Sequence, residues 1–541
     1  MFQGIGKSLE SCENGFMTLK PLGDSAWLVE FSADFSLAAI MGLVVALEND
    51  RPPGVLDVVP SFDSVAVHFG DADGREILRW IESAVISNKE TDGKEVRIPV
   101  VYGGEDGPDL TEVAGQIGLS EDEVIRVHSE AIYTVAAVGF SPGFPYLTGL
   151  PDCLKVPRRA TPRREVPAGS VAVAGAQAGI YPFASPGGWQ ILGRTSARLF
   201  DPTAVRPSLL RAGDRVTFVP VRELELADGV EAALPIAEDH WIEVIQPGAL
   251  TTVQDLGRPG HEAAGVSPGG AVDRHALRVA NLLVGNNEGA AALEICMSGP
   301  VLRFHAATTV AWVGGSGKSM TVAAGETLDF SRVRGSVRAY LAVAGGLRVP
   351  VVLGSAATDV RAGFGGHHGR ALRVGDRLET GRVGRIPQPG HWHVGREGRA
   401  KQVRLRVLTG VQHGWFSEEA HTRLFSETYQ LTPMADRMGA RLSGPPLDLN
   451  FPIEMVSQPV ACGSVQVPPD GQPIILMAER QTIGGYPQIA HVISVDLPKL
   501  ARAWPGTAVR FQRISLEEAR ELKRREAQDF AWLRTGLNLL K

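Results

Sequence analysis

The sequence predicts a mainly β protein of several domains, with an α+β part near its beginning. A chain of 541 residues is longer than one hydrophobic core ordinarily supports, so about two to four domains are expected. Its 62 glycines and 36 prolines are scattered without a period, which is typical of many short strands joined by tight turns. One motif also occurs twice, once in each half, which indicates related β modules.

Composition disfavours several kinds of partner. The net charge of -6 provides no basic field for nucleic acid. No stretch reaches the roughly 18 apolar residues of a membrane span. The four cysteines are far apart, without a C-x-x-C pair or a nearby histidine at metal-ligand spacing, so we expect reduced thiols, no protein-held metal and a cytoplasmic location. Residues 1–17 have no apolar run and are interpreted as an N-terminal extension.

The first half is expected to contain an α+β subdomain at residues 18–90, followed by a barrel at 91–222. The subdomain alternates strands with amphipathic helices, at residues 26–31, 35–48, 64–69 and 75–87. Two short helices then start at Asp109 and Ser120, each followed by an acidic residue at the capping-box position.

The second half is separated from the first by an acidic linker at residues 223–240. A weakly patterned stretch at 385–402 divides it into β modules at 241–384 and 403–514. The chain closes with a helix at 515–541, which begins with a Ser-Leu-Glu-Glu capping box and carries an apolar stripe.

The internal repeat joins residues 166–182 to residues 467–487. Both copies end in a Gln, Gly, Tyr-Pro hairpin, at 177–182 and 481–487, which we interpret as equivalent barrel positions. Each copy precedes a strand closed by glycine, and a third echo of that strand occurs at 375–378. The pattern predicts one β module in the first half and two in the second, with closed barrels removing exposed strand edges.

An aromatic, glycine-rich loop at residues 139–146 has two interpretations. Its rings could plug one end of a barrel, or they could stack on a flat ligand while glycine lets backbone N–H groups approach. A similar segment at 185–189 favours a binding site. The predicted cofactor-binding residues here are Phe140, Pro142, Gly143, Phe144, Tyr146, Tyr181, Ser185, Gly187, Gly188 and Trp189.

Four arginines at residues 158–164 are either a solvated basic edge or a phosphate clamp. The guanidinium fork matches phosphate oxygens bidentately, which favours the clamp. Arg158 is assigned to cofactor binding, and the predicted catalytic set is Arg163, Arg164, Gln177 and His128.

Polar clusters in the second half are the predicted substrate-binding residues: Gln254, Asp255, Arg258, Asp436, Arg437, Gln466, Gln481, Thr482 and Tyr486. Asp255 and Arg258 could instead bond to each other across a turn, and the same holds at 436–437. Residues 314–319 resemble a phosphate loop, but Trp312 stands where that motif needs glycine, so a hairpin turn is expected.

These motifs resemble a known pair of families. Residues 139–146, 166–171 and 185–189 resemble the KipI-type protein, also called allophanate hydrolase subunit 1 or the B-type subunit of 5-oxoprolinase. Residues 254–258, 436–439 and 481–487 resemble the KipA-type protein, or the C-type subunit of the same enzyme. The resemblance implies cyclophilin-like β-barrels, one after the α+β piece and two in the second half.

The implied activity is ATP-dependent opening of 5-oxoproline to glutamate, with Mg²⁺ as the counter-ion of ATP and a separate LamB/YcsF-type subunit completing hydrolysis. We expect the first half to hold ATP and the second to present the substrate amide, in a homo-oligomer. The same domain pair serves biotin-dependent urea carboxylation, although no biotinylation motif is present, and the KipI-type name also allows a kinase-regulating protein without turnover. Arg502, residues 505–507 and residues 411–413 depart from the family pattern, so the substrate stays open.

Overall fold

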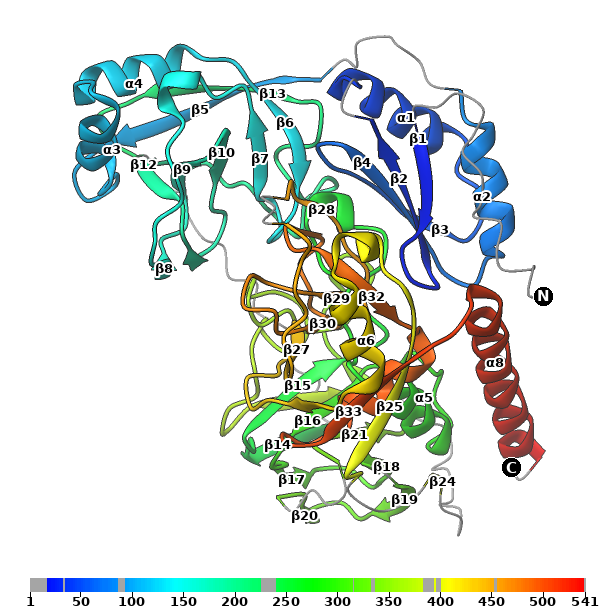
Figure 1. Ribbon diagram of the computed structural model, residues 1–541. Helices are drawn as coiled ribbons and strands as arrows, with labels where there is room; N and C mark the ends of the chain where they lie inside the picture. Colours follow the sequence, from blue (N-terminus) through cyan, green and yellow to red (C-terminus); the bar gives the residue numbers. More distant parts are fainter. Residues whose placement is uncertain are drawn as a thin grey trace, which may run out of the picture.

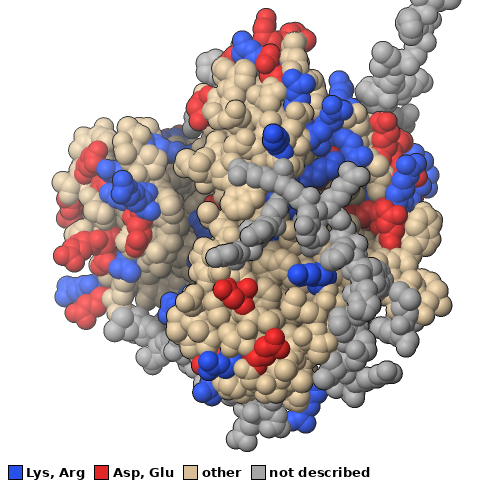
Figure 2. All heavy atoms as spheres, turned by 90° about the horizontal axis from the view of Figure 1, so that it is seen from below, with Lys and Arg blue, Asp and Glu red and all other residues tan. Residues whose placement is uncertain are grey.

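The computed structural model describes residues 17–32, 35–85, 93–224, 240–314, 316–331, 336–382, 394–395, 400–451 and 455–539. These residues form a mainly β protein with helices on its outside, and they contain two closed seven-stranded barrels (Figure 1). The predicted mainly β fold class with closed barrels is therefore confirmed, whereas of the two barrels expected in the second half the described residues show one closed barrel. No helix in the described ranges is both long enough and apolar enough to cross a membrane. On the face seen from below, basic and acidic side chains are interspersed (Figure 2).

The α+β subdomain is a four-stranded antiparallel sheet covered by two helices. The strands are β1 (Met17–Pro21), β2 (Ala26–Phe31), β3 (Val55–Pro60) and β4 (Ser64–Phe69), in the order β1-β2-β4-β3. The helices are α1 (Leu37–Asn49), which Ser36 caps, and α2 (Gly74–Ser83), which Asp73 caps. Both helices, β2 and β4 were expected, whereas β1 and β3 were not.

The first barrel is closed by strands in the order β10-β7-β6-β13-β5-β12-β9. Its strands are β5 (Glu95–Tyr102), β6 (Tyr133–Val138), β7 (Pro145–Thr148), β9 (Ser170–Ala174), β10 (Gln177–Ile180), β12 (Gln190–Arg194) and β13 (Arg215–Pro220). Helices α3 (Leu110–Ile117) and α4 (Glu121–Glu130) cover it, with the short helix η1 (Asp152–Leu154) in a connection, and the predicted capping box at Ser120 is present. Outside the barrel, β8 (Arg163–Val166) pairs with β11 (Ser185–Gly187).

The middle module consists of two sheets of five and six strands. The first contains β14 (Trp241–Gln246), β17 (Val301–Phe304), β20 (Thr327–Asp329), β22 (Leu347–Arg348) and β23 (Arg377–Thr380). The second contains β15 (Leu250–Gln254), β16 (Ala292–Cys296), β18 (Thr308–Gly314), β19 (Ser316–Val322), β21 (Arg338–Val343) and β24 (Val394–Gly395). Helices η2 (Glu262–Ala264) and α5 (Arg274–Leu283) complete it. Gly314 pairs with Ser316, so the phosphate-loop look-alike is a hairpin as expected.

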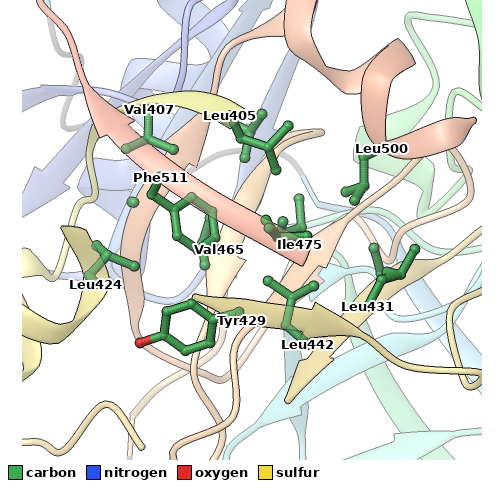
Figure 3. Packing of buried hydrophobic residues seen from close by; sticks show 14 of the residues in the cluster. Leu405, Val407, Leu424, Tyr429, Leu431, Leu442, Val465, Ile475, Leu500 and Phe511 are labelled. Carbon is green, nitrogen blue, oxygen red and sulfur yellow. The ribbon is translucent and has the colours of Figure 1, made fainter. Parts of the chain in front are cut away.

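The second barrel packs the core drawn in Figure 3, in which Leu405, Tyr429 and Phe511 are buried. Its strands are β25 (Gln402–Thr409), β26 (Tyr429–Leu431), β27 (Gly439–Ser443), β29 (Ser464–Gln466), β30 (Ile474–Leu476), β32 (Gln488–Val492) and β33 (Ala508–Arg513). Outside the barrel lie β28 (Gln458–Pro459), β31 (Ile483–Gly484), η3 (His413–Trp415), η4 (Ser494–Asp496), α6 (Glu418–Ser426) and α7 (Leu497–Ala501).

The two barrels have equivalent strand orders, which corrects the alignment of the repeat. In each, the glycine-closed strand runs parallel to the first strand, β13 beside β5 and β33 beside β25. Following the order around each barrel, β10 corresponds to β30, so Gln177 aligns near Ile474. Gln481 instead precedes β31, which pairs with β28 as β11 pairs with β8. The hairpins at 177–182 and 481–487 are therefore not equivalent positions.

The two halves are packed together over several elements. Asp24 accepts hydrogen bonds from the backbone and hydroxyl of Ser494, at 3.0 and 2.7 Å. The final helix, α8 (Leu516–Leu539), has the predicted capping box and inserts Phe530 against α5, as its apolar stripe implied. Lys523 of α8 donates to the carbonyl of Gly70, so this helix joins the second half to the α+β subdomain.

Candidate functional site

A pocket lies where loops of the first barrel meet both modules of the second half. We call it the junction pocket. The first barrel contributes residues 140–142 and 183–185, the middle module contributes Gly265, Ser267, Asp359, Arg361 and Ala362, and the second barrel contributes Glu479 and Arg480. Its walls thus come from three modules that are far apart in the sequence.

The aromatic loop is fixed against the middle module. Gly143 donates a backbone hydrogen bond of 2.9 Å to Ala264, and a Cβ on Gly265 would lie 2.5 Å from the carbonyl oxygen of Ser141. Phe140 adopts a φ of 66°, in the left-handed region that disfavours a bulky residue. Tertiary packing therefore holds this loop in a conformation that the isolated segment would avoid.

Most rings of the predicted cofactor set form a buried cluster. Phe144, Tyr146, Tyr181 and Trp189 meet one another edge to face, and Ile483 of the second half packs against them. Burial raises the pKa of Tyr181 to about 12, which keeps its hydroxyl neutral. The plug interpretation is therefore favoured for these four rings. Of the predicted set, only Phe140, Pro142 and Ser185 line the junction pocket.

The two glycines of the 185–189 segment are held by contacts within the first half, and Gly187 has no room for a side chain. A Cβ on Gly187 would lie 2.4 Å from the Tyr181 hydroxyl, and the carbonyl of Gly188 accepts the N–H of Arg159 at 2.8 Å. Ser185 differs from them, because its hydroxyl is buried without a hydrogen-bond partner among the described residues. A polar ligand in the junction pocket would satisfy that hydroxyl.

The arginine segment is held by a carboxylate that the sequence did not single out. Arg163 donates to both oxygens of Asp109, at 2.9 and 2.6 Å, and Arg159 donates to one of them at 2.8 Å. Asp109 is buried and also accepts the N–H of Ile191, rather than capping α3 through its side chain. Because a protein carboxylate occupies its guanidinium fork, the structure favours a structural role for Arg163, and its catalytic assignment stays a prediction.

Two further members of the predicted catalytic set, Arg164 and Gln177, lie outside the pocket lining, as does Arg158 of the predicted cofactor set. Arg158 and Arg164 are exposed and form no ion pair with any described residue, which fits the solvated-edge interpretation. Gln177 is half-buried at the start of β10.

His128 is a core residue. Its ring stacks on Phe218 at a centroid distance of 4.6 Å and contacts the hydroxyl of Tyr102 at 2.8 Å. Burial lowers the pKa of His128 to about 3, so the imidazole is neutral. The structure gives His128 a packing role and corrects its assignment as catalytic.

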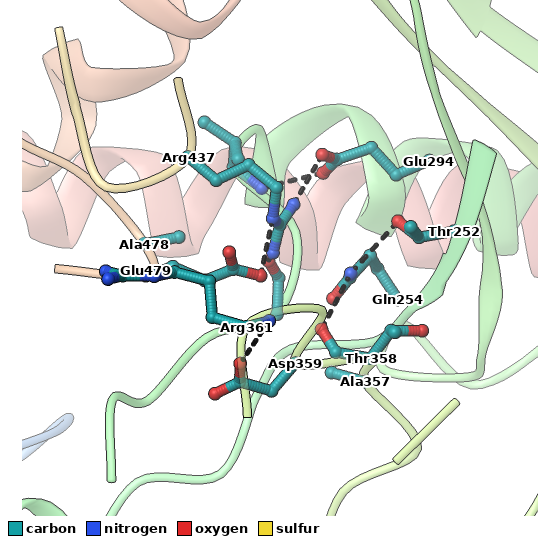
Figure 4. A network of polar contacts seen from close by, with 12 residues as sticks. Thr252, Gln254, Glu294, Ala357, Thr358, Asp359, Arg361, Arg437, Ala478 and Glu479 are labelled. Atoms are coloured by element: carbon teal, nitrogen blue, oxygen red, sulfur yellow. Dashed lines mark hydrogen bonds and ion pairs between the residues drawn. The ribbon is translucent and has the colours of Figure 1, made fainter. Parts of the chain in front are cut away.

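A buried charge network in the second half contains Arg437 at its centre (Figure 4). Its guanidinium pairs with Glu294 at 2.5 Å and with Glu479 at 2.7 Å. Although burial opposes it, the ion pair with Arg437 holds the pKa of Glu294 below its ordinary value. Burial raises the pKa of Glu479, with nearby Asp359 adding to the effect and Arg437 opposing it. The network therefore ends in a carboxylate at the junction pocket that binds a proton more readily than an exposed glutamate.

Asp255 and Arg258 hold loops rather than each other. Asp255 accepts the hydroxyl of Ser355 at 2.6 Å and the N–H of Ala356 at 2.7 Å. Arg258 donates to the carbonyls of Val352 and Ala357. Among the described residues their hydrogen bonds go to other partners, so the alternative of a bond between the two side chains is not supported. Neither lines the junction pocket, so that pocket gives no support to their substrate-binding assignment.

The remaining predicted substrate residues also lie outside the pocket lining. Asp436 is exposed and accepts the N–H groups of its own turn. The amide nitrogens of Gln466 and Gln481 converge on Gly484, where an added Cβ would lie 2.6 and 2.7 Å from them. Gln254 and Thr482 are both fully buried, and each has one side-chain oxygen without a hydrogen-bond partner among the described residues. Tyr486 is exposed.

Four charged pocket residues were missed from the sequence: Asp359, Arg361, Glu479 and Arg480. The signal that could have found them was a Glu-Arg pair in the turn that follows strand β30, and an Asp-x-Arg in a glycine-rich loop. Arg480 pairs with the buried Glu262 at 2.5 Å. Arg361, in contrast, has no carboxylate partner in the described part of the chain and contacts the sulfur of Met438. Its cation is free to bind an anionic ligand.

Comparison with known proteins agrees with the division into halves. Residues 17–210 match the family "Carboxyltransferase domain, subdomain C and D", and residues 264–513 match "Carboxyltransferase domain, subdomain A and B". The first half is similar to the B-type subunit of 5-oxoprolinase from Escherichia coli O157:H7, at 43% identity over 37% of this chain and 95% of that protein. The second is similar to the C-type subunit of 5-oxoprolinase from Escherichia coli K12, at 38% identity over 54% of this chain and 98% of that protein. The chain belongs to the family of B-type and C-type 5-oxoprolinase subunits.

Both types are thus joined in one polypeptide, and the junction pocket lies between the B-type and the C-type half. The solved structure of TTHA0988 has the same arrangement, with a TM-score of 0.78 at 36% identity over 90% of this chain and 99% of that one. The second half is also similar to urea amidolyase of Saccharomyces cerevisiae, at 31% identity over 54% of this chain but 18% of that protein. The family therefore extends to enzymes of which this chain covers a small part.

Proposed function

We propose that this chain is the ATP-handling component of a 5-oxoprolinase. It phosphorylates the lactam oxygen of 5-oxoproline, and a separate LamB/YcsF-type subunit then hydrolyses the product to glutamate. The observation that carries the proposal is the junction pocket, in which the aromatic loop and the unpartnered Ser185 hydroxyl of the B-type half face charged side chains of the C-type half. Relatives of the two halves are named as subunits of 5-oxoprolinase, which supports further partner subunits.

The proposed reaction is balanced by ATP and water. The lactam oxygen attacks the γ-phosphorus, ADP leaves, and the ring becomes an O-phosphorylated imidate. One water then adds to that carbon and the C–N bond opens, with the ring nitrogen leaving as the amino group, which gives an acyl phosphate of glutamate. A second water hydrolyses the acyl phosphate to glutamate and inorganic phosphate. Phosphorylation is needed because the resonance-stabilised amide carbonyl resists water, whereas phosphate is a good leaving group.

The pocket residues suit the charges of this reaction. Arg361 donates to phosphate oxygens, since no described carboxylate neutralises it. Glu479 accepts the lactam N–H proton as the oxygen is phosphorylated, because its raised pKa makes it a stronger base than an ordinary glutamate. Ser185 donates its unpartnered hydroxyl to the substrate.

Magnesium would enter with the nucleotide. Mg²⁺ in phosphoryl-transfer sites is bound by one or two carboxylates together with substrate phosphates. Asp359 offers one such carboxylate at the pocket, and no cluster of three or more metal-ligating side chains occurs in the described residues. The ion would supply neutralisation of phosphate charge.

The test mixes the purified chain with its LamB/YcsF-type partner, ATP, Mg²⁺ and 5-oxoproline, and measures glutamate and ADP. Equal amounts of both, formed only when both proteins are present, support the proposal. The carboxyltransferase family and the urea amidolyase relatives favour a second candidate, biotin-dependent carboxyl transfer. Carboxylation of urea from carboxybiotin, without glutamate formation, would select that candidate instead.

A further inference from the structure

A second cavity adjoins the junction pocket, and we call it the side pocket. It is the larger of the two, at about 320 Å³, and includes Phe183, Arg198, Phe200, Ala362, Gly363 and Phe364. Phe183 and Ala362 line both pockets, so the two cavities share a wall. Its size falls at the lower end of the roughly 300–1,000 Å³ usual for small-molecule sites.

The side pocket is aromatic, and both halves of the chain build it. The Phe183 and Phe200 rings of the first half lie 6.0 Å apart edge to face, and Phe364 of the middle module lies 5.6 Å from Phe200. The guanidinium carbon of Arg258 lies 4.8 Å from the centre of the Phe364 ring, and this cation–π contact helps to hold the ring in place. Phe183 is half-buried, so part of its ring remains free for a ligand.

The chemistry of the two cavities differs in a way that matches the two ends of a nucleotide. Apart from Arg198, which pairs with Asp201, the side pocket offers aromatic and apolar side chains, which stack on a flat heteroaromatic ring and remove it from water. The junction pocket offers the cation of Arg361 beside two carboxylates. A nucleoside triphosphate is long enough to place its base in one cavity and its phosphates in the next.

Resting on the proposed function, we infer that the side pocket holds the purine ring of ATP, with the triphosphate extending past Phe183 to Arg361. The rings first predicted for this task, such as Phe144 and Trp189, are packed against one another and line neither the junction pocket nor the side pocket. The small, polar lactam fits the charged junction pocket better than this aromatic one. An apolar peptide of a partner is the competing occupant.

Photolabelling with 8-azido-ATP tests the position of the base without requiring turnover. We expect the label in peptides containing residues 182–202 or 362–364, with ATP protecting them and inorganic triphosphate protecting them less. Label confined to other segments, such as 139–146 or 158–164, would overturn the assignment while leaving ATP binding intact. If no labelling occurs at any nucleotide concentration, both this inference and the proposed function fail.

A matched pair of variants supplies the second test, in the complex with the LamB/YcsF-type partner. Phe183→Ala removes a half-buried ring at the side pocket, and Phe425→Ala removes a half-buried ring of α6 on the second barrel. A lost base–aromatic stack predicts roughly a tenfold higher KM for ATP in Phe183→Ala, with the KM for 5-oxoproline nearly unchanged. The Phe425→Ala control should leave both constants unchanged.

An unchanged KM for ATP in Phe183→Ala, or an equal rise in the KM for ATP and the KM for 5-oxoproline, would overturn the inference. Normal glutamate formation by the same variant would still support the proposed function. Thermal unfolding of each variant checks that the fold is retained. If Phe183→Ala does not fold, Phe183→Leu serves instead, because leucine keeps the apolar volume but cannot stack.

Discussion

Replacing Arg163 by alanine separates a structural role from a phosphate-binding one. In the structure, Arg163 makes two of the hydrogen bonds that hold the buried carboxylate of Asp109, while Arg159 and the N–H of Ile191 supply the others. Removing one partner from a buried ion pair costs about 3–5 kcal/mol. Because Arg159 remains bound to Asp109, we expect a smaller loss, about 2–3 kcal/mol in the free energy of unfolding.

The assay combines urea unfolding with ATP turnover in the reconstituted complex. Arg164→Ala, one residue along and exposed, is the matched control and should change stability by less than about 0.5 kcal/mol. In a double-mutant cycle with Asp109→Asn, the effects of the two changes should be strongly non-additive, since they remove one interaction. Turnover abolished by Arg163→Ala at unchanged stability would refute this reasoning and restore the phosphate clamp.

Three further predictions concern the junction pocket and acid stability. Glu479→Gln should lower kcat by about 10²–10⁴-fold. It should also flatten the rise of kcat with pH, because that rise reflects deprotonation of the Glu479 carboxyl, whose pKa is raised by burial. An unaltered pH profile would exclude Glu479 as the base. Arg361→Ala should raise the KM for ATP by roughly 10-fold or more without changing the melting temperature. The exposed control Arg348→Ala should change neither the KM for ATP nor the melting temperature. Acid should destabilise the fold, because burial lowers the pKa values of His128 and His491 to about 3, so below pH 6.5 the unfolded chain binds two protons that the folded chain does not. Urea unfolding should show a loss from these two groups approaching about 2.7 kcal/mol per pH unit near pH 5, and a flat profile would contradict the prediction.

Local rules predicted much of the fold. The capping boxes at Ser120 and Ser515 were correct because a cap depends on residues three positions apart. The glycine-closed strands β13 and β33 were also recognised, and both run parallel to the first strand of their barrel. The segment at 481–487 was wrongly aligned with the hairpin at 177–182. Short turns that contain Gly and Tyr-Pro occur between different pairs of strands, so the shared residues did not identify equivalent strands.

The site was harder to predict because its residues meet only through tertiary packing. Arg163 and Asp109 are 54 positions apart, and no local pattern announces that one neutralises the other. The sequence likewise cannot distinguish an aromatic loop that binds a ligand from one that plugs a barrel, as Phe144 does. Glu479 and Arg361 reach one pocket from different modules, so their joint role became visible only in the folded chain.

The most direct test of the central claim is the stoichiometry of glutamate and ADP. Purified chain and LamB/YcsF-type partner are incubated with ATP, Mg²⁺ and 5-oxoproline, and both products are measured with each protein alone and together. The account predicts one glutamate for each ADP in the mixture and no glutamate from the chain alone. Glutamate formation by the partner without this chain, or ATP hydrolysis in the mixture that does not depend on 5-oxoproline, would contradict it.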